Sequence, residues 1–474
     1  MPLLVETPDT RAPERDYILG VVLGDFLGLP WRRVAGSSID TRITFPDYAG
    51  ELRMPDCFLS LPDDKWLIPA SLPGQPLLVW DSSELGLNIN LIDSRLPIIY
   101  GDLGFPARCH SSGEKRAAIN EDQIFLPLDI FGSAFFMLTR YEEIVKPDRD
   151  ERDRFPAWAS LAYQEGFLDR PIIDEYVEVI WSVMKILWPR LQRRKNLYQV
   201  NLSHDVDSVL YGPFANPISL GKQIAGDFFK TKDGNLAWKR FVSVLDAKRG
   251  YHDGDPHNTF DFIMNCSERY GLKSAFYFMT GGAHKSDANY DIYMPWIKEL
   301  IRNIGERRHE VGIHPSYETY LDPKATRDEF QALLNVAEEC NIRQVAWGGR
   351  QHNLRWSARQ TWKNWEEAGL TYDSSLGYAQ HAGFRTGSCF EYCTFDLIDR
   401  KALSLRERPL IVMEGTLFNR RYMRLSYKES AFSIQELSKT CKLLKGRFTL
   451  LWHNNKLLTK KDKQFYSKLL ETII

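Results

Sequence analysis

Residues that can bind metals or transfer protons recur in this sequence directly after short apolar runs. They are Asp205, Asp207, His314, Arg350, His352, Asp373 and His453. The chain contains only 10 histidines, and the group includes His314, His352 and His453. Carboxylate and imidazole groups serve hydrolases both as metal ligands and as acids or bases. One such position would mean little, but so many in order predict a hydrolytic site.

The apolar runs that precede these residues are short, and they alternate with segments of helical spacing. The runs span residues 198–207, 273–279, 309–314, 343–352, 370–377, 410–416 and 447–453. Such alternation is typical of a parallel α/β fold, and about 280 residues of it fit a (β/α) barrel. Active sites of these barrels lie at the carboxyl ends of the strands, where the polar residues fall. Residues 208–258 are expected to be a long insertion with its own helices.

Five motifs carry these residues, and they occur in the order SHDVD, GIHPS, GRQH, YDSSLG and LLWHN. In order and residue type they resemble the polysaccharide deacetylases, which are the NodB-homology enzymes of carbohydrate esterase family 4. The resemblance covers residues 197–474. It implies a distorted (β/α)7 barrel with a divalent metal ion. A divergent branch of these deacetylases, which has an N-terminal domain of unknown function, looks similar along the whole chain.

The first motif departs from the pattern of that family. The family has adjacent aspartates, the first a base and the second a metal ligand, whereas Val206 here separates Asp205 from Asp207. Side chains two residues apart on an extended strand point to the same side. Both carboxylates can therefore face one metal ion.

The second and third motifs depart in a way that suggests compensation. Where the family has a second histidine four residues after the first, His314 is followed by Glu318. The third motif reads Arg350-Gln351-His352 in place of Arg-Pro-Pro. We expect His352 to supply the missing ligand, with Glu318 as the alternative.

The expected metal ligands are thus Asp207, His314 and His352. Three protein ligands leave positions for water and substrate, as a catalytic zinc site requires. The expected cofactor is a divalent metal, with Zn²⁺ as the first choice. An alternative is a site that has lost its metal and only binds sugar.

The resemblance also implies catalytic roles for the remaining motif residues. Asp205 would be the general base, and the positive charge of Arg350 beside it would favour the ionised carboxylate. His453 would protonate the leaving amine. A histidine acid usually needs an orienting carboxylate, and Asp373 or Glu414 could provide it.

Further residues are expected near the substrate or behind the site. A backbone N–H near Tyr317 would hold the developing oxyanion. Arg385, in the glycine-containing loop GFRTGS (383–388), could bind an anionic group of the substrate or face solvent. His204 precedes Asp205 and is expected to point away from the site as a structural residue.

Residues 1–195 are expected to form a smaller α+β domain that ends in the basic segment RLQRRKN (190–196). Helical spacing appears in residues 128–145 and 172–188. The charged run KPDRDERDR (146–154) between them is expected to be a surface loop. The role of this domain stays open among substrate binding, dimerisation and covering the barrel mouth.

Composition narrows the class of protein and its location. Lys and Arg total 61 against 62 Asp and Glu, so a broad basic field for nucleic acid is excluded. The chain lacks an apolar run long enough to span a bilayer and an N-terminal secretory signal, and its 7 cysteines are scattered. These features predict a cytoplasmic protein with free thiols.

The predicted function is that of a metal-dependent N-deacylase, a hydrolase of carbon–nitrogen bonds other than peptide bonds. The resemblance implies an amino sugar of a bacterial surface glycan, such as O-antigen, lipopolysaccharide, capsule or exopolysaccharide. A cytoplasmic enzyme would meet that sugar in a glycan, lipid-linked or nucleotide-linked form. The alternatives are an amidohydrolase of small molecules and a non-catalytic carbohydrate-binding protein. Assembly into a homo-oligomer stays open.

Overall fold

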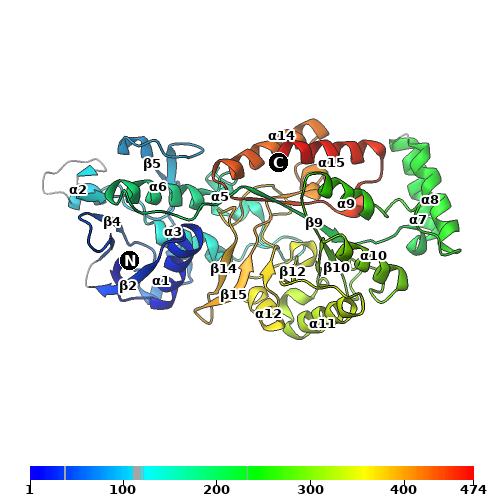
Figure 1. The fold of residues 1–474 in the computed structure, drawn as a ribbon, viewed down its shortest axis with the longest axis horizontal. Coiled ribbons are helices and arrows are strands. Elements are labelled where there is room, and N and C mark those ends of the chain that lie inside the picture. The colour runs from blue at the N-terminus through cyan, green and yellow to red at the C-terminus, as the bar shows by residue number, and fades with distance from the viewer. Residues whose placement is uncertain (37–38, 110–118, 121, 232) are drawn as a thin grey trace.

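The computed structural model describes residues 1–36, 39–109, 119–120, 122–231 and 233–474 (Figure 1). The molecule is elongated, with the N-terminal strands at one end and the helices α7 and α8 at the other. The strands of the described residues form a six-stranded, a nine-stranded and a two-stranded sheet.

All seven strand-like runs predicted from the sequence contain strands of the nine-stranded sheet. They are β9 (Gln199–Val206), β10 (Ser274–Phe278), β11 (Glu310–Ile313), β12 (Gly348–Gly349), β13 (Tyr372–Asp373), β16 (Val412–Met413) and β17 (Arg447–Leu451). Their order is β13-β12-β11-β10-β9-β17-β16, and every neighbouring pair is parallel. Read around a circle, this order follows the chain, as in a barrel. The backbone N–H of Leu410, before β16, donates to the carbonyl of Leu376, after β13, at 3.2 Å. The predicted α/β class with a parallel sheet is confirmed.

Two strands that the sequence analysis did not predict extend this sheet beyond β13. Strand β15 (Lys401–Glu407) pairs parallel with β13, and β14 (Tyr392–Asp396) pairs antiparallel with β15. The hairpin turn between them is held by Asp396, whose Oδ1 accepts from the N–H groups of Ile398 and Asp399 at 2.8 and 2.9 Å.

Amphipathic helices connect the strands of this sheet and pack against it. They are α9 (Phe260–Arg269), α10 (Pro295–Glu306), α11 (Pro323–Glu339), α12 (Thr361–Ala368), α13 (Glu414–Phe418), α14 (Tyr427–Leu443) and α15 (Lys460–Ile473). In α10, for example, Ile297, Leu300, Ile301 and Ile304 are buried at helical spacing. Capping boxes begin α14 at Ser426 and α15 at Thr459. Because these helices pack on the sheet, they fix where its strands end.

The N-terminal part contains the six-stranded sheet and a group of helices. Its strands are β1 (Leu3–Pro8), β2 (Trp31–Gly36), β3 (Asp40–Thr44), β4 (Glu51–Pro55), β7 (Ile119–Asn120) and β8 (Gln123–Phe125), with β5 (Leu78–Asp81) and β6 (Arg95–Ile98) paired separately. Its helices are α1 (Ala12–Leu19), η1 (Gly20–Phe26), α2 (Phe105–Cys109), α3 (Ile130–Leu138), α4 (Tyr141–Val145), α5 (Leu161–Gln164) and α6 (Ile172–Leu187). The six-stranded sheet has the order β2-β1-β3-β4-β8-β7 and mixes parallel and antiparallel pairs.

The N-terminal helices pack directly on the strands β14 and β15. The hydroxyl of Tyr17 in α1 donates to the carbonyl of Cys393 at 2.8 Å, and that of Tyr392 donates to the carbonyl of Leu138 at 2.9 Å. One apolar core cluster runs through both parts of the chain. The two unpredicted strands therefore join the two parts, while the domain boundary at 190–196 stays a prediction.

The segment 128–145 contains two helices instead of the continuous pattern expected. Helix α3 ends before Arg140, whose φ of 56° lies in the left-handed region and turns the chain into α4. Arg140 is completely buried, where it donates to Glu142 and Glu143 at 2.9 and 2.8 Å. The apolar spacing predicted the helices but not this break, at which Arg140 also donates to the hydroxyl of the distant Tyr378 at 3.3 Å.

The insertion after β9 protrudes as a helical hairpin, which is green in Figure 1. It consists of α7 (Pro217–Gly226), η7 (Asp227–Thr231) and α8 (Gly234–Ala247). Among the described residues, no helix combines the length and apolar character needed to cross a membrane.

Candidate metal centre and active site

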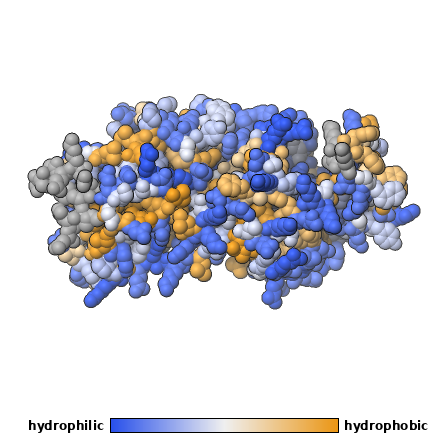
Figure 2. All heavy atoms as spheres, turned by 90° about the horizontal axis from the view of Figure 1, so that it is seen from above, coloured by the Kyte–Doolittle hydropathy of each residue, from blue (hydrophilic) through white to orange (hydrophobic). Residues whose placement is uncertain are grey.

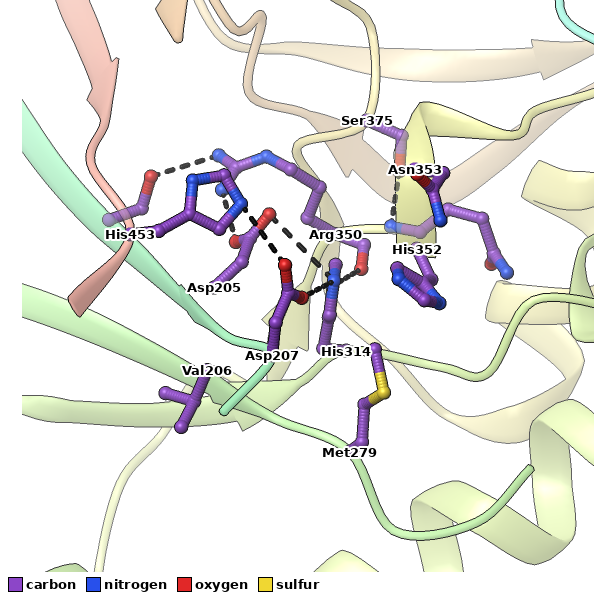
Figure 3. A network of polar contacts seen from close by, with 12 residues as sticks. Asp205, Val206, Asp207, Met279, His314, Arg350, His352, Asn353, Ser375 and His453 are labelled. Carbon is purple, nitrogen blue, oxygen red and sulfur yellow. Dashed lines mark hydrogen bonds and ion pairs between the residues drawn. The ribbon is translucent and has the colours of Figure 1, made fainter. Parts of the chain in front are cut away.

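Most of the predicted motif residues meet at the carboxyl ends of the parallel strands (Figure 3). Asp205 is the penultimate residue of β9, and Asp207 follows that strand. His314 follows β11, and His352 lies three residues after β12. Each side chain is therefore placed by the end of a strand that is fixed on both sides by hydrogen bonds.

Asp207, His314 and His352 form a three-residue group that could hold a metal ion. One potential ligand atom from each lies within 4.8 Å of the other two. Asp207 Oδ1 is 3.3 Å from His314 Nε2, and the rings of His314 and His352 are 5.0 Å apart. The two imidazoles are buried and Asp207 is partly exposed, so the group faces an opening.

Hydrogen bonds behind the two histidines orient them for metal binding. His314 Nδ1 lies 2.6 Å from the carbonyl oxygen of Arg350, and His352 Nδ1 lies 3.0 Å from Asp287 Oδ1. An imidazole whose Nδ1 donates presents Nε2 as the ligand atom. Both Nε2 atoms are thus the natural ligands.

Asp287 is a site residue that the sequence analysis missed. It lies in the loop after β10, where its carboxylate also accepts from the backbone N–H groups of Tyr317 and His284 at 2.8 and 2.9 Å. These bonds hold Asp287 against His352. The one signal for it in the sequence is an acidic residue in a loop that follows a strand end.

The donor set fits a cation by charge and by hydrogen bonding. Asp207 Oδ1 is buried, and within the described part of the chain no hydrogen bond satisfies it, although His314 lies near. Burial acts to lower the pKa of His314, but the negative charges of Asp205 and Asp207 outweigh this effect and raise the pKa. Burial would raise the pKa of Asp207, but the adjacent imidazole of His314 and the charge of His453 hold it well below its usual range. An ionised carboxylate and two imidazoles that meet at one point can hold a metal ion, which displaces any proton from its ligand atoms.

Glu318, the alternative ligand, lies outside this group. Its side chain is 71% exposed, and its carboxylate pairs with Arg355 at 3.1 Å. The geometry therefore favours His352 as the third ligand.

Asp205 and Arg350 form a buried ion pair beside the metal ligands. Arg350 Nη1 donates to Asp205 Oδ1 at 2.7 Å, and Oδ2 of the same carboxylate lies 3.9 Å from His314 Nε2. The guanidinium also donates to the hydroxyls of Ser203 and Ser374 at 2.9 and 3.0 Å. Arg350 is therefore held rigidly, and it fixes one carboxylate oxygen while the other faces the site.

His453 lies on the opposite side of Asp207 and is paired with Glu414. Its Nδ1 is 2.7 Å from Glu414 Oε1, and its Nε2 is 3.6 Å from Asp207 Oδ2. Burial acts to lower the pKa of His453, but the negative charge of Glu414 outweighs it and raises the pKa to about 9. An imidazolium fixed in this way presents an N–H at Nε2.

Asp373, the other candidate partner of His453, has a structural role instead. Its Oδ1 accepts from the backbone N–H of Ser375 at 2.9 Å and from the hydroxyl of that residue. It is completely buried, and burial raises its pKa to about 6. Glu414 therefore orients His453, which corrects the expectation of a catalytic Asp373.

The backbone N–H of Tyr317 itself donates to Asp287 and is not free for an oxyanion, so the expected donor near Tyr317 stays a prediction. The tyrosine ring nevertheless borders the site, at 6.2 Å and a perpendicular angle of 84° from the ring of His352. It is covered by His284 and Arg355, which lie 4.0 and 3.9 Å from it.

Arg385 lies away from the metal ligands, in the contact between the two parts of the chain. Only 2% of the side chain is exposed, and it donates to both carboxylate oxygens of Glu143 at 2.9 and 2.6 Å. A third bond reaches the carbonyl of Gly377 at 3.0 Å. These bonds use the guanidinium, so the expectation that Arg385 binds an anionic substrate is wrong.

His204 points to the other side of β9, as its position next to Asp205 predicts. Its ring nitrogens lie 2.6 Å from the carbonyl oxygen of Trp452 and 3.0 Å from the hydroxyl of Ser274. It therefore ties β9 to the strands on both sides.

The charged run 146–154 is a loop with exposed residues, as expected, but its end packs on the turn that follows His352. Arg154 is buried and donates to the carbonyl of Asn353 at 2.9 Å. Arg152 also contacts the side chain of Asn353, and Asp153 accepts from the hydroxyl of Tyr320. The N-terminal part thus supports one wall of the site.

The comparison with family models matches the N-terminal part of the chain. A family of unknown function, DUF7033, matches residues 3–189. No curated protein matches the sequence.

Among solved structures, one described as a polysaccharide deacetylase from Mycobacterium smegmatis is similar at 14% identity and a TM-score of 0.38. The match covers 59% of this chain and 84% of that chain. A CE4 family pseudoenzyme from Bacillus anthracis matches at 9% identity and a TM-score of 0.30, over 59% of this chain and 62% of that chain. An allantoinase matches at 11% identity and a TM-score of 0.34, over 60% of this chain and 85% of that chain. These likenesses are distant, and we take the function from the geometry of the site alone.

Proposed function

We propose that this protein is a metal-dependent hydrolase that removes the N-acyl group from an amino sugar. The observation that carries the proposal is the placement of a candidate base and a candidate acid on either side of one metal-binding group. The base is Asp205, held by Arg350, and the acid is His453, held by Glu414. A binding protein needs no such pair.

Asp207, His314 and His352 would hold the metal, and Zn²⁺ suits one carboxylate and two imidazoles. When bound, such an ion polarises the acyl oxygen and makes water a better nucleophile near neutral pH. The outer hydrogen bonds from Asp287 and the carbonyl of Arg350 keep the two imidazoles in the ligand orientation.

The protein side chains would handle the protons of the reaction. Asp205 accepts the proton of the attacking water through the oxygen that Arg350 does not occupy. His453 donates the proton from Nε2 to the leaving nitrogen, without which the amine is a poor leaving group. Glu414 balances the charge of the imidazolium and fixes its direction.

We infer the substrate class from the resemblance of the five motifs to those of the polysaccharide deacetylases. An amino sugar of a bacterial surface glycan, carried by a lipid or a nucleotide and met in the cytoplasm, suits a protein with a balanced net charge of -1. Such a substrate is largely neutral at the sugar that reacts.

Metal analysis tests the ligand set. Purified protein, stripped by a chelator and reloaded with Zn²⁺, should retain one equivalent of metal, and Asp207→Ala and His352→Ala should retain much less. His381→Ala, which changes a loop histidine outside the site, is the matched control. Full metal retention by His352→Ala would contradict the proposed ligand set, and loss in Glu318→Ala alone would favour the rival ligand.

Amine release tests the activity. N-acylated nucleotide sugars, lipid-linked glycans and small cyclic amides would be offered to the metal-loaded protein, with Asp205→Asn as the inactive control. Release from the sugars alone supports the proposal, and release from the cyclic amides alone would assign a small-molecule amidohydrolase. Metal-loaded protein that releases no amine from any of them would favour a binding role.

A further inference from the structure

The helical hairpin of residues 217–249 exposes large apolar side chains that the rest of the protein does not cover. Its exposed apolar residues are Ile218, Phe228, Phe229, Trp238, Phe241 and Leu245. Phe229 is 83% exposed and Trp238 is 63% exposed. Figure 2 shows hydrophobic residues on the surface at this end of the molecule. Exposed apolar groups gathered in this way mark an interaction surface.

Helix α8 has two apolar faces, and only one of them is used within the protein. Leu236, Ala237 and Ser243 are buried on the inner face, where α8 packs on α7 and on residues 212–214. Trp238, Phe241 and Leu245 are spaced by three and four residues, so they share the opposite face. The rings of Trp238 and Phe241 lie 5.8 Å apart, which makes this outer face continuous.

The exposed charges around this outer face are positive. Lys222, Lys239, Lys248 and Arg249 are exposed. The hairpin has three acidic residues, of which Asp227 is buried and pairs with Arg240 at 2.8 Å. Asp233 and Asp246 are half-buried, and Asp233 caps the first turn of α8. Within the described residues, the hairpin therefore presents aromatic rings and cations together.

We propose that this hairpin docks the protein on an anionic membrane surface. Aromatic and aliphatic side chains on one face of a helix enter the boundary between headgroups and acyl chains. Lysine and arginine side chains beside them contact lipid phosphates. The positive charges complement an anionic bilayer, and they would oppose docking on a second, identical hairpin.

The hairpin is rigidly connected to the candidate active site. The insertion that carries the hairpin begins directly after Asp207, and Asn454, the neighbour of His453, donates to the carbonyl of Ser208 at 2.9 Å. Asp255 joins the two ends of the insertion, because it accepts from the N–H groups of Tyr211 and Gly212 at 2.8 and 2.7 Å. Docking would thus hold the domain that carries the site at the bilayer surface. If the proposed function holds, this favours a lipid-linked sugar over a nucleotide-linked one.

Vesicle sedimentation of the full-length protein tests the docking without any need for activity. The probes are vesicles of phosphatidylcholine alone and of phosphatidylcholine mixed with phosphatidylglycerol. The wild-type protein should bind the mixed vesicles, and high salt should weaken the binding because it screens the cations. The double variant Trp238→Ala/Phe241→Ala should bind at least about tenfold more weakly, since it removes most of the inserted apolar area.

Phe432→Ala is the matched control, because Phe432 is 65% exposed on α14, outside the hairpin. It should bind like the wild type, and circular dichroism should show that every variant is folded. Failure of the wild type to bind mixed vesicles, or equal binding by the double variant, would overturn the proposal. So would light scattering that shows a dimer abolished by Trp238→Ala/Phe241→Ala, because the face would then join two copies of the chain. If the wild-type protein binds the mixed vesicles but releases no amine from any substrate, the proposed function is wrong and the docking proposal stands.

Discussion

Arg154 Nη1 donates to the backbone carbonyl oxygen of Asn353 at 2.9 Å, across 199 residues of sequence. Asn353 directly follows the candidate metal ligand His352, and its φ of 58° lies in the left-handed region, which asparagine tolerates better than most residues. The next residue, Leu354, has a φ of 56°. The N-terminal part thus stabilises a strained turn that aims His352 into the site.

This contact predicts that Arg154→Ala weakens metal binding although Arg154 touches no ligand atom. Without the guanidinium, the turn can relax, and His352 loses its fixed direction. We expect the dissociation constant for Zn²⁺ to rise about tenfold, as for other outer partners of metal sites. A competition titration with a chromophoric chelator measures it. Arg421→Ala is the control. It removes an exposed arginine that pairs with Glu151 of the charged run 146–154, and it should leave the dissociation constant for Zn²⁺ unchanged.

Asp287 predicts a stronger effect at the same ligand. Asp287→Ala removes the acceptor of His352 Nδ1, so the ring can rotate and Nε2 is no longer the preferred ligand. Metal affinity should fall about 10- to 100-fold. Asp287→Asn retains an acceptor oxygen and should lose less. Asp291→Asn, in the same loop, is the control, and unchanged affinity in Asp287→Ala would show that His352 needs no carboxylate behind it.

The pairing of His453 with Glu414 predicts different effects for substitutions of Glu414 and Asp373, two acidic residues that the sequence alone does not distinguish. Glu414→Gln should lower kcat for amine release about 100-fold, because it removes the charge that holds the imidazolium. Asp373→Asn should lower the thermal stability and leave kcat near that of the wild type, because Asp373 bonds to Ser375. Steady-state kinetics and thermal melts on both variants decide between them. The reverse result would return Asp373 to the catalytic group.

The sequence revealed the residues whose position depends on a strand end. Asp205, Asp207, His314, His352 and His453 follow apolar runs, so the parallel sheet alone brings them to one edge. Glu414 also follows a strand, but nothing in the sequence distinguishes it from Asp373. That choice depends on side-chain directions at the ends of two strands.

Residues that act through loops or across the two parts of the chain could not be predicted in this way. Asp287 reaches His352 from a loop whose path no periodicity describes. Arg385 and Arg154 have charged surroundings typical of a solvated surface, yet each is buried against a distant segment. Their partners, Glu143 and the carbonyl of Asn353, are 242 and 199 residues away in the chain.

His204 predicts how the stability of the protein depends on pH. It is buried behind the site, and burial lowers its pKa to about 3, against roughly 6.5 in the unfolded chain. Above about pH 6.5, His204 is unprotonated in both the folded and the unfolded protein, so it contributes no pH dependence there. Between the two values the unfolded chain binds a proton that the folded protein does not, and stability falls as pH falls, by up to ~1.4 kcal/mol per pH unit.

Denaturant unfolding at a series of pH values measures this slope. His204→Gln should be less stable at pH 7 but should show a shallower slope, whereas His252→Gln, in the insertion, should keep the wild-type slope. An unchanged slope in His204→Gln would show that other groups cause the acid sensitivity.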